Sequence, residues 1–383
     1  MPFRRTASHR PRGLYVVFRR LTGPRRFDVA LVAPQALVVL TLALAVHPLV
    51  AAAMALVAYH LTAALRAGWH SVYSVEPRDD RHLHFGLWPF FAWWVACTAF
   101  VLLTPLALTA LLFGAPAKLA LGVAGAAAAA IGLHGVRRTP RIRRITLRFP
   151  HLPPAFDGYR IAQLSDIHCG PFAPEGRVAR WVRRTQRLRA DLIAVTGDLV
   201  ASGSAYVEPV GRALQGLSAP DGVYACMGNH DYFGAGERLV RALEASGLRV
   251  LRNAATLIER GDGRLRLAGV DDTWVGRADV SRALAGAPRA DFTVLLAHDP
   301  DVFPRAAAHE VDLTLSGHTH GGQLGVPLLS RTWNLARLVT RFTAGLYRQG
   351  TSVLYVNRGI GTTGPPVRIG ARAEIALITL RRG

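Results

Sequence analysis

The sequence predicts a membrane-embedded helical region followed by an α/β domain, and three observations support this prediction. Residues 29–136 contain long runs without charged side chains. From about residue 155, short apolar runs alternate with Arg-rich amphipathic stretches of helical length. Five of those apolar runs end in Asp, Asn or His. Alternation of strands and helices is typical of an α/β fold, in which ligands gather beyond the carboxyl ends of the strands.

The composition excludes several other classes of protein. The chain has 383 residues, of which 50% are hydrophobic and 19% are charged. This composition excludes a disordered tail protein and a collagen-like fibre. Three cysteines in so long a chain exclude a disulfide-stapled secreted domain. The net charge of +21 comes almost wholly from Arg. A general bias toward Arg would produce this charge without any polyanionic partner.

Four membrane spans are predicted, near residues 29–46, 49–65, 88–113 and 118–136. The first uncharged run has 37 residues, or about 55 Å of helix, which is too long for one crossing of about 30 Å. The His47-Pro48 pair near its middle predicts two helices joined by a turn, because a helix usually ends before a proline. Trp88, Trp93 and Trp94 in the third span suit a membrane–water interface.

Arg-rich flanks predict the orientation of these spans. Residues 1–28 form a basic N-terminus, and the segments 66–87 and 137–154 also carry several Arg. With four spans, these three segments lie on one side, which the positive-inside rule makes cytoplasmic. We therefore expect a multi-pass protein of the inner (plasma) membrane, with the lipid bilayer as a partner. The segment 137–154 is expected to be a basic linker into a cytoplasmic domain at 155–383.

Other interpretations of the apolar region remain open. The uncharged runs could be buried helical hairpins of a soluble protein. Arg25-Arg26-Phe27 before an apolar run also resembles a twin-Arg signal, which would place the following domain on the exported side. The later spans argue against a simple cleaved signal. A transporter or channel has little support, because the spans carry almost no ionisable residues.

The domain at 155–383 is predicted to contain eight strands and four helices. The strands fall near 159–165, 191–196, 222–227, 265–270, 292–297, 311–316, 352–356 and 373–380. The helices fall near 175–189, 206–217, 235–247 and 300–309. The order of these elements indicates a sheet whose strand ends gather candidate ligands at one edge.

Five strand ends carry most of the candidate chemistry. In chain order they supply Asp166-Ile167-His168, Gly197-Asp198, Gly228-Asn229-His230-Asp231, His298 and Gly317-His318-Thr319-His320. In an extended segment, residues two apart point the same way, so each Asp-x-His or His-x-His pair can serve one site. A single such Asp is more often a turn former, and a single His is more often a surface or core residue. Together they indicate a metal site, because burying so many of these groups without a cation would be costly.

This order of motifs resembles the calcineurin-like metallophosphoesterase superfamily over residues 164–323. The stretch 354–361, with Pro366-Val367-Arg368 and Ala373-Glu374-Ile375, is similar to the ending of the bacterial membrane-associated branch of that superfamily. The resemblance implies a four-layer α/β/β/α sandwich over about 155–383, and a metal-dependent phosphoesterase activity. It is specific for fold and chemistry and weak for substrate.

The resemblance also implies two divalent or transition metal ions, of which Mn, Fe and Zn suit carboxylate, amide and imidazole ligands. One ion would take Asp166, His168, Asp198 and His320. The other would take Asp198, Asn229, His298 and His318. Two such ions clamp a phosphoryl group and lower the pKa of a bound water, giving a hydroxide that attacks phosphorus. We expect His230 to donate a hydrogen bond to the phosphoryl or leaving oxygen, and Asp231 to orient that imidazole.

Three further features of the domain have two interpretations each. Cys169 adjoins a predicted ligand, but the ligand count is already full, so we expect it to pack as a small apolar residue. Asp271, Asp272 and Asp299 are expected to form turns or support ligands, with substrate contact as the alternative. The segment 331–348 has apolar residues on one helical face. It fits either a helix packed on the sheet or a membrane-facing lid that admits a lipid-borne phosphoester.

The expected substrate is a phosphorylated small molecule, a phosphodiester or pyrophosphate of a lipid or cell-envelope precursor. The anchor places the site within reach of the bilayer, and the family branch includes enzymes that cleave lipid A precursors. The alternative is a nuclease or cyclic-nucleotide phosphodiesterase on the same core. Nucleic acid ranks lower, because the domain lacks a basic stripe interleaved with aromatic residues. A non-catalytic scaffold would lack some ligands, and all are present; protein partners stay unidentified.

Overall fold

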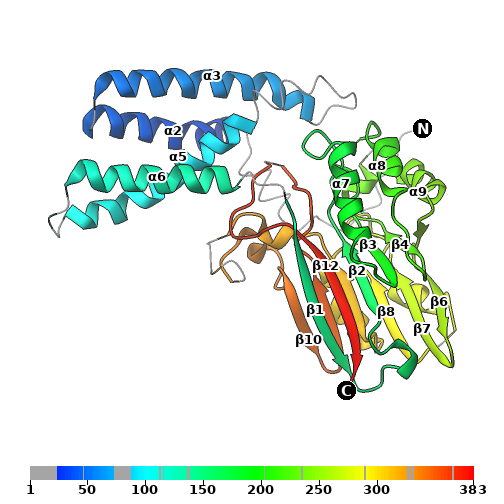
Figure 1. The fold of residues 1–383 in the computed structure, drawn as a ribbon. Coiled ribbons are helices and arrows are strands. Elements are labelled where there is room, and N and C mark those ends of the chain that lie inside the picture. Colours follow the sequence, from blue (N-terminus) through cyan, green and yellow to red (C-terminus); the bar gives the residue numbers. More distant parts are fainter. Residues whose placement is uncertain are drawn as a thin grey trace. The chain divides into compact units, whose positions relative to one another are not determined.

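The chain forms two compact units in the computed structural model. One comprises Met1–Ala63 with Ala92–Leu133, and the other comprises Ala64–Phe91 with His134–Gly383. Figure 1 shows helices in the first unit and two sheets with helices in the second. The structure describes residues 24–45, 47–72, 88–111, 114, 116–135, 139–201, 203–233, 236–288, 290–325, 329, 332–364 and 366–383.

The predicted apolar segments are helical. They form α2 (Pro24–Ala45), α3 (Pro48–Val72), α5 (Trp88–Leu111) and α6 (Ala117–Gly135). Among the described residues, Trp88–Thr109 and Ala117–Gly135 are long and apolar enough to cross a membrane, whereas the apolar parts of α2 and α3 are shorter. The break at His47-Pro48 is therefore confirmed, but four membrane spans stay a prediction.

A buried glutamine links three helices of the first unit. Gln35 on α2 is 3% exposed. Its Nε2 donates to Thr62 Oγ1 of α3 at 3.3 Å, and Trp93 Nε1 of α5 donates to its Oε1 at 2.9 Å. Because an unpaired amide among apolar side chains is costly, these bonds favour one register of the three helices.

The second unit contains two six-stranded mixed sheets. The first has the order β1 (Arg141–Phe149), β12 (Glu374–Arg382), β2 (Arg160–Leu164), β3 (Leu192–Thr196), β4 (Val223–Cys226) and β5 (Arg249–Val250). The second has the order β10 (Gly345–Gln349), β11 (Ser352–Val356), β9 (Leu313–Ser316), β8 (Phe292–Leu296), β7 (Gly263–Gly269) and β6 (Ala254–Arg260). Strands β2, β3 and β4 are parallel to one another, as are β7, β8 and β9. Their carboxyl ends therefore meet at one edge of each sheet.

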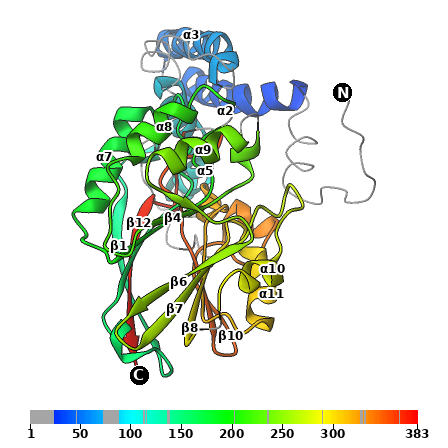
Figure 2. The same ribbon diagram turned by 90° about the vertical axis from the view of Figure 1, so that its right-hand side faces the viewer.

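Helices cover the outer face of each sheet, which gives a helix–sheet–sheet–helix sandwich. The first sheet packs on α7 (Glu175–Gln186), α8 (Val207–Leu214) and α9 (Gly236–Ala245), and the second on α10 (Val280–Ala285) and α11 (Phe303–Ala308). Figure 2 shows α7 and the α10–α11 pair on opposite sides of the strands. The side chains alternate as strands require: Ile161 faces the cluster between the sheets, and Ala162 faces the helices. The mixed sheets agree with the predicted α/β fold.

The expected linker at 137–154 is wrong, because most of it is a strand. Residues Arg141–Phe149 form β1, which pairs in parallel with β12 along its whole length. Strand β1 lies at the edge of the first sheet. Arg residues obscured the strand in the sequence, yet charged side chains are a common protection of an exposed sheet edge. Strands β5, β6 and β10 and helix α10 were also not predicted.

The single amphipathic helix expected at 331–348 is wrong as well. A 3₁₀ turn, η6 (Leu335–Leu338), precedes strand β10, which pairs antiparallel with β11. Phe342 is buried whereas Leu335 and Leu338 are exposed, so the periodic apolar positions do not share one face. Only the turn at 335–338 bonds to its own backbone, whereas residues 345–349 bond to β11, so strand pairing overrides the helical periodicity.

Candidate metal centre

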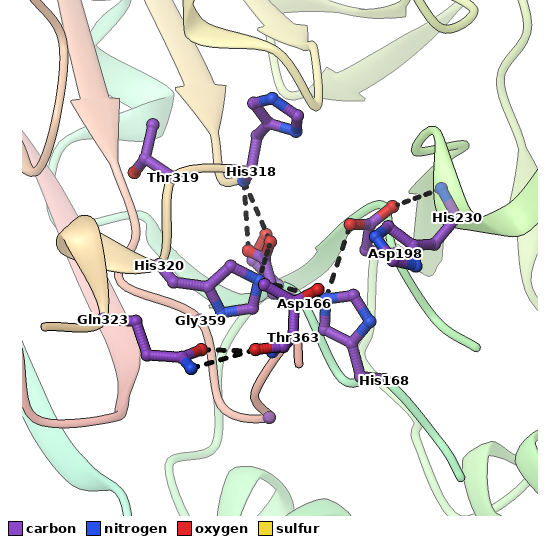
Figure 3. Close-up of polar contacts among 12 residues, drawn as sticks. Asp166, His168, Asp198, His230, His318, Thr319, His320, Gln323, Gly359 and Thr363 are labelled. Carbon is purple, nitrogen blue, oxygen red and sulfur yellow. Dashed lines mark hydrogen bonds and ion pairs between the residues drawn. The ribbon is translucent and has the colours of Figure 1, made fainter. Parts of the chain in front are cut away.

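The loops that follow β2, β3, β8 and β9 bring six predicted ligands together. The structure forms two groups, Asp166, His168, Asp198 and His320, and Asp198, His298 and His318. Within each group the possible ligand atoms lie within 4.8 Å of one another. Figure 3 shows these loops converging, with the backbone nitrogen of His318 bonded to the Asp166 carboxylate. The carboxylate of Asp198 belongs to both groups.

The two oxygens of Asp198 have different surroundings. Its Oδ1 accepts a hydrogen bond from the backbone N–H of His230 at 2.9 Å. Its Oδ2 lies 3.4 Å from His168 Nε2 and 3.3 Å from His298 Nε2. One oxygen is thus held by the backbone, while the other faces an imidazole of each group. This is the arrangement that a bridging carboxylate requires.

A hydrogen bond to the backbone orients the imidazole of His298. Its Nδ1 donates to the backbone carbonyl of Thr196 at 2.8 Å. A carbonyl oxygen only accepts hydrogen bonds, so Nδ1 carries the proton, and in the neutral ring Nε2 keeps a free lone pair. That Nε2 lies 3.2 Å from His318 Nδ1. Such outer contacts are typical of histidines that bind metal.

The donor set fits a metal site. His168 Nε2 and His320 Nε2 lie only 3.0 Å apart, and His320 Nε2 is 3.4 Å from Asp166 Oδ1. Asn229 Oδ1 is buried without a hydrogen-bond partner among the described residues. A buried acceptor left without a donor costs about 1–3 kcal/mol. A cation would satisfy these facing lone pairs, and mixed carboxylate, amide and imidazole donors suit Mn, Fe or Zn.

Burial sets the protonation states that such a site needs. Burial lowers the pKa of His168 to about 3 and that of His320 well below its usual range, so both imidazoles are neutral. Burial raises the pKa of the Asp166 carboxyl to about 6. Burial would also raise the pKa of Asp198, but the neighbouring imidazoles, His298 first, hold it well below its ordinary range. Burial alone would lower the pKa of His298, but the charges of Asp198 and Asp166 raise it well above its usual range, so without a cation His298 is the protonated partner of Asp198. A bound cation would take the place of that proton.

The backbone around the site is strained. The described residues include nine non-glycine positions with positive φ, and five of them are predicted ligands. These are Asp166, His168, Asp198, His318 and His320, with φ between 45° and 69°. Side chains other than Gly, Asn and Asp rarely adopt this region, and such strain clusters at functional sites. This loop conformation therefore lowers the stability of the fold, and it directs the ligand side chains toward one another.

Two glycines of the motifs give the carboxylates room. A Cβ on Gly317 would collide with Ser165 and Asp166, and one on Gly228 would collide with Asp198. The glycine that precedes Asn229 and the glycine that precedes His318 are thus needed because the loops approach each other closely.

His230 lies beside the site, but Asp231 does not orient its ring as we expected. His230 Nδ1 contacts the backbone carbonyl of Ala201 at 2.6 Å, and its ring centroid is 4.7 Å from that of His168. Asp231 instead accepts three backbone N–H bonds, from Leu199 and Val200 through Oδ1 and from Gly228 through Oδ2. The expectation for Asp231 is wrong, because its buried carboxylate is used up in joining two ligand loops.

Two residues at the site were missed by sequence reasoning. The guanidinium of buried Arg368 donates to the carbonyl of His320 at 3.2 Å and contacts His320 Nδ1 at 3.1 Å. The ring of Trp274 lies 5.7 Å from that of His318. Arg368 belongs to the Pro366-Val367-Arg368 stretch that resembles the family, but its contact with His320 had no signal there, and Trp274 had none at all, because each reaches the site from outside the ligand motifs.

Asp272 and Asp299 form turns as predicted, and Cys169 packs as predicted, whereas the carboxylate of Asp271 accepts from the Tyr232 hydroxyl and from Arg252 Nε. Asp272 Oδ1 accepts from the backbone N–H of Trp274 at 2.9 Å, and Asp299 Oδ1 accepts from Asp301 N at 2.9 Å. Cys169 is fully buried in the apolar cluster between the first sheet and its helices, and it is outside both candidate ligand groups.

Comparison with known proteins identifies the family. Residues 159–322 match the model of the calcineurin-like phosphoesterases. The chain is 33% identical over 245 residues to the uncharacterized metallophosphoesterase YkuE of Bacillus subtilis (strain 168), a match that covers 62% of this chain and 84% of that protein. The chain belongs to the calcineurin-like phosphoesterase family. It is a metal-dependent phosphoesterase, as the resemblance implied.

Other relatives of this metallophosphoesterase come from distant organisms. An uncharacterized metallophosphoesterase of Aquifex aeolicus (strain VF5) is 31% identical over 63% of this chain and 92% of its own length. The transmembrane protein with metallophosphoesterase domain of Danio rerio is 33% identical over 66% of this chain. The match covers 60% of the length of that fish protein.

The loop-joining role of Asp231 predicts the effect of Asp231→Ala. Three buried N–H groups lose their acceptor, so the free energy of unfolding should fall by about 3 kcal/mol or more, and bound metal should decrease. Thermal unfolding and metal analysis of the full-length protein measure both effects. His309→Ala, which removes an exposed imidazole, is the control. Unchanged stability and metal content with reduced turnover would instead support the orienting role.

Proposed function

We propose that this metallophosphoesterase is a membrane-anchored phosphohydrolase that works with two divalent metal ions. The observation that supports it is the position of Asp198 Oδ2 between an imidazole of each candidate group. The first ion would be held by Asp166, His168, Asp198 and His320. The second would be held by Asp198, Asn229, His298 and His318. When bound, such ions supply Lewis acidity to a phosphoryl oxygen and to an attacking water.

The chain itself contributes a proton donor beside these ligands. Because His230 Nδ1 is committed to the Ala201 carbonyl, its Nε2 carries a proton only in the doubly protonated imidazolium. In that form it would donate to the phosphoryl oxygen or to the leaving oxygen, where negative charge develops. Its backbone N–H, which holds Asp198 Oδ1, keeps the ring next to the shared carboxylate.

The membrane part of the proposal rests on the apolar helices and on the relatives. Helices α5 and α6 have the length and hydropathy of spans, and the relatives from Danio rerio and Bos taurus are named transmembrane proteins. An even number of spans keeps the Arg-rich segments before α5 and after α6 on one side, which we propose is cytoplasmic. The substrate would be a phosphoester or pyrophosphate of a lipid or cell-envelope precursor.

Removing a ligand of the second ion should abolish activity. In Asn229→Ala or His318→Ala, turnover of bis(p-nitrophenyl) phosphate should fall by about a hundredfold or more, and bound metal should drop from two equivalents toward one. Turnover and metal per chain, by mass spectrometry, are measured on full-length protein in detergent over a series with Mn and Zn. His309→Ala serves as the control. Wild-type turnover in the Asn229 or His318 variant would show that the site is misassigned.

The proton-donor role predicts a different result for His230→Ala. Turnover should fall by about 10²–10⁴-fold, the usual contribution of a positioned acid or base. Both metal equivalents should remain, because His230 is not among the proposed ligands. Loss of metal from this variant would make His230 a ligand rather than a donor.

The orientation is tested by labelling a new cysteine with a membrane-impermeant maleimide. The three native cysteines are buried, so they give little background. Arg144→Cys lies at an exposed position of β1, and it should react only after the cells are lysed. A cysteine placed in the exposed turn at Glu310 is a second reporter on the same domain. Labelling of either position in intact cells would place the domain on the exported side.

A further inference from the structure

The exposed apolar side chains of the catalytic domain gather at one edge. In the described part of residues 139–383, all the large apolar side chains that are exposed come from the loops after β4, β7 and β9. They are Phe233, Trp274, Val275, Leu329, Trp333, Leu335, Leu338 and Val339, and we call them the apolar rim. The same three loops carry Asn229, Asp272 and His318. Single exposed apolar residues are ordinary, but their concentration around a site indicates a binding surface.

Two members of the apolar rim lie against histidines at the metal centre. The ring of Phe233 lies 5.0 Å from that of His230, and the ring of Trp274 lies 5.7 Å from that of His318. The buried carboxylate of Asp272 holds the Trp274 loop by accepting from two successive backbone N–H groups. A phosphoryl group at the centre would therefore leave the rest of its molecule beside these rings.

In the segment 332–339 of the apolar rim, polar atoms bond within the protein while large apolar side chains face the surroundings, whereas a water-exposed segment usually shows the opposite. Its polar atoms make contacts within the protein: Leu335 N donates to Leu324 O at 3.2 Å, and Asn334 Oδ1 accepts from Arg337 N at 3.1 Å. Its large apolar side chains point outward, with Trp333 67% and Leu338 76% exposed. This arrangement presents hydrocarbon to the surroundings although the backbone is anchored, so an apolar environment is expected to cover it.

The charged side chains beside the apolar rim indicate which kind of molecule binds there. Arg337 lies in this segment and Arg341 lies two residues after it; both are exposed, and Arg337 Nη1 donates to the carbonyl of Arg341 at 2.9 Å. Leucine and tryptophan with arginine next to them match a lipid interface, where acyl chains lie beside phosphate headgroups. A nucleotide base could stack on Trp274, but it would leave the aliphatic side chains unused.

We infer that the apolar rim inserts into the headgroup–acyl boundary of a bilayer and receives the hydrocarbon part of a lipid phosphoester. The metal centre would then take the phosphoryl group of the same molecule, and Arg337 and Arg341 would contact neighbouring lipid phosphates. The inference rests on the proposed function for its substrate, and it names the substrate class as phosphoesters that carry a long hydrocarbon chain.

Insertion is tested without any turnover by the fluorescence of Trp333. The full-length protein is placed in nanodiscs of phosphatidylglycerol and phosphatidylcholine, with plain or brominated acyl chains. The contribution of Trp333 is the difference between the wild type and Trp333→Phe. It should be strongly quenched by the brominated chains. The contribution of Trp181, obtained with Trp181→Phe, is the control, because this side chain is buried against the first sheet.

Lack of quenching at Trp333 would overturn the inference whether or not the enzyme turns over any ester. Lack of quenching together with a dimer in detergent would assign the apolar rim to a second copy of the chain. Loss of stability in Trp333→Phe with no quenching in the wild type would assign it to another segment of the same chain.

Substrate selection is tested with two esters that have the same scissile bond, methyl p-nitrophenyl phosphate and hexadecyl p-nitrophenyl phosphate in mixed micelles. The wild type should prefer the hexadecyl ester. Leu335→Gln with Leu338→Gln should lower kcat/KM for that ester by about tenfold or more, because each buried apolar side chain contributes an effect of this size. Turnover of the methyl ester should change less than about twofold.

Control variants separate membrane insertion from the proposed phosphohydrolase activity. They also separate the attraction of arginine to lipid phosphate from the binding of hydrocarbon. Arg337→Gln with Arg341→Gln should weaken binding to anionic micelles more than Arg180→Gln with Arg183→Gln, which removes the same charge from exposed positions of α7. Equal losses would overturn the role of Arg337 and Arg341. An equal tail preference in the wild type and in the leucine variant would overturn hydrocarbon binding. Quenching of Trp333 without turnover of either ester would fault the proposed function and not the insertion.

Discussion

The structure of the catalytic domain depends on one shared carboxylate, that of Asp198. One imidazole of each group, His168 after β2 and His298 after β8, faces its Oδ2, and its Oδ1 is held by the backbone of the loop after β4. The buried Asn229 Oδ1 has no hydrogen-bond partner among the described residues, and a bound cation would satisfy it together with the converging carboxylates and imidazoles. Positive φ at five ligands and the lack of a Cβ at Gly228 and Gly317 follow from this convergence. Packing of the two sheets against each other and against their helices offsets the free energy that the strained loops cost.

The parallel order of the strands is what lets one carboxylate serve both groups. Strands β2, β3 and β4 end at one edge of the first sheet, and β8 and β9 end at the matching edge of the second. The apolar cluster between the sheets fixes how far apart these two edges lie. Buried Asp231 and Arg368 then join neighbouring loops through backbone N–H and carbonyl groups. The fold is thus a rigid support for loops that could not hold their own conformation.

The sequence predicted the ligand side chains because their signal is local. An Asp, Asn or His directly after a buried apolar run marks a strand end, and such motifs at five strand ends indicate one site. The roles of Asp231 and Arg368 depend on which distant backbone groups they meet, and no local pattern carries that information. Strand β1 was missed because its Arg residues hide the alternation of an edge strand, and the segment 331–348 because its apolar spacing mimics a helix while its backbone pairs with β11. In both cases tertiary pairing overrode a local preference.

The places where the catalytic domain exposes large apolar side chains bear on both its substrate and the membrane. A soluble phosphoesterase for small polar substrates has no need to expose leucines and tryptophans, and exposure of them costs free energy in water. In the described part of residues 139–383, the exposed large apolar side chains all come from three loops that also carry site residues, and the rings of Trp274 and Phe233 lie next to site histidines. The remaining described surface, including the Arg-rich outer face of α7, is polar. Exposed apolar side chains next to the site would suit the substrate proposed above, which carries both a phosphoryl group and a hydrocarbon chain.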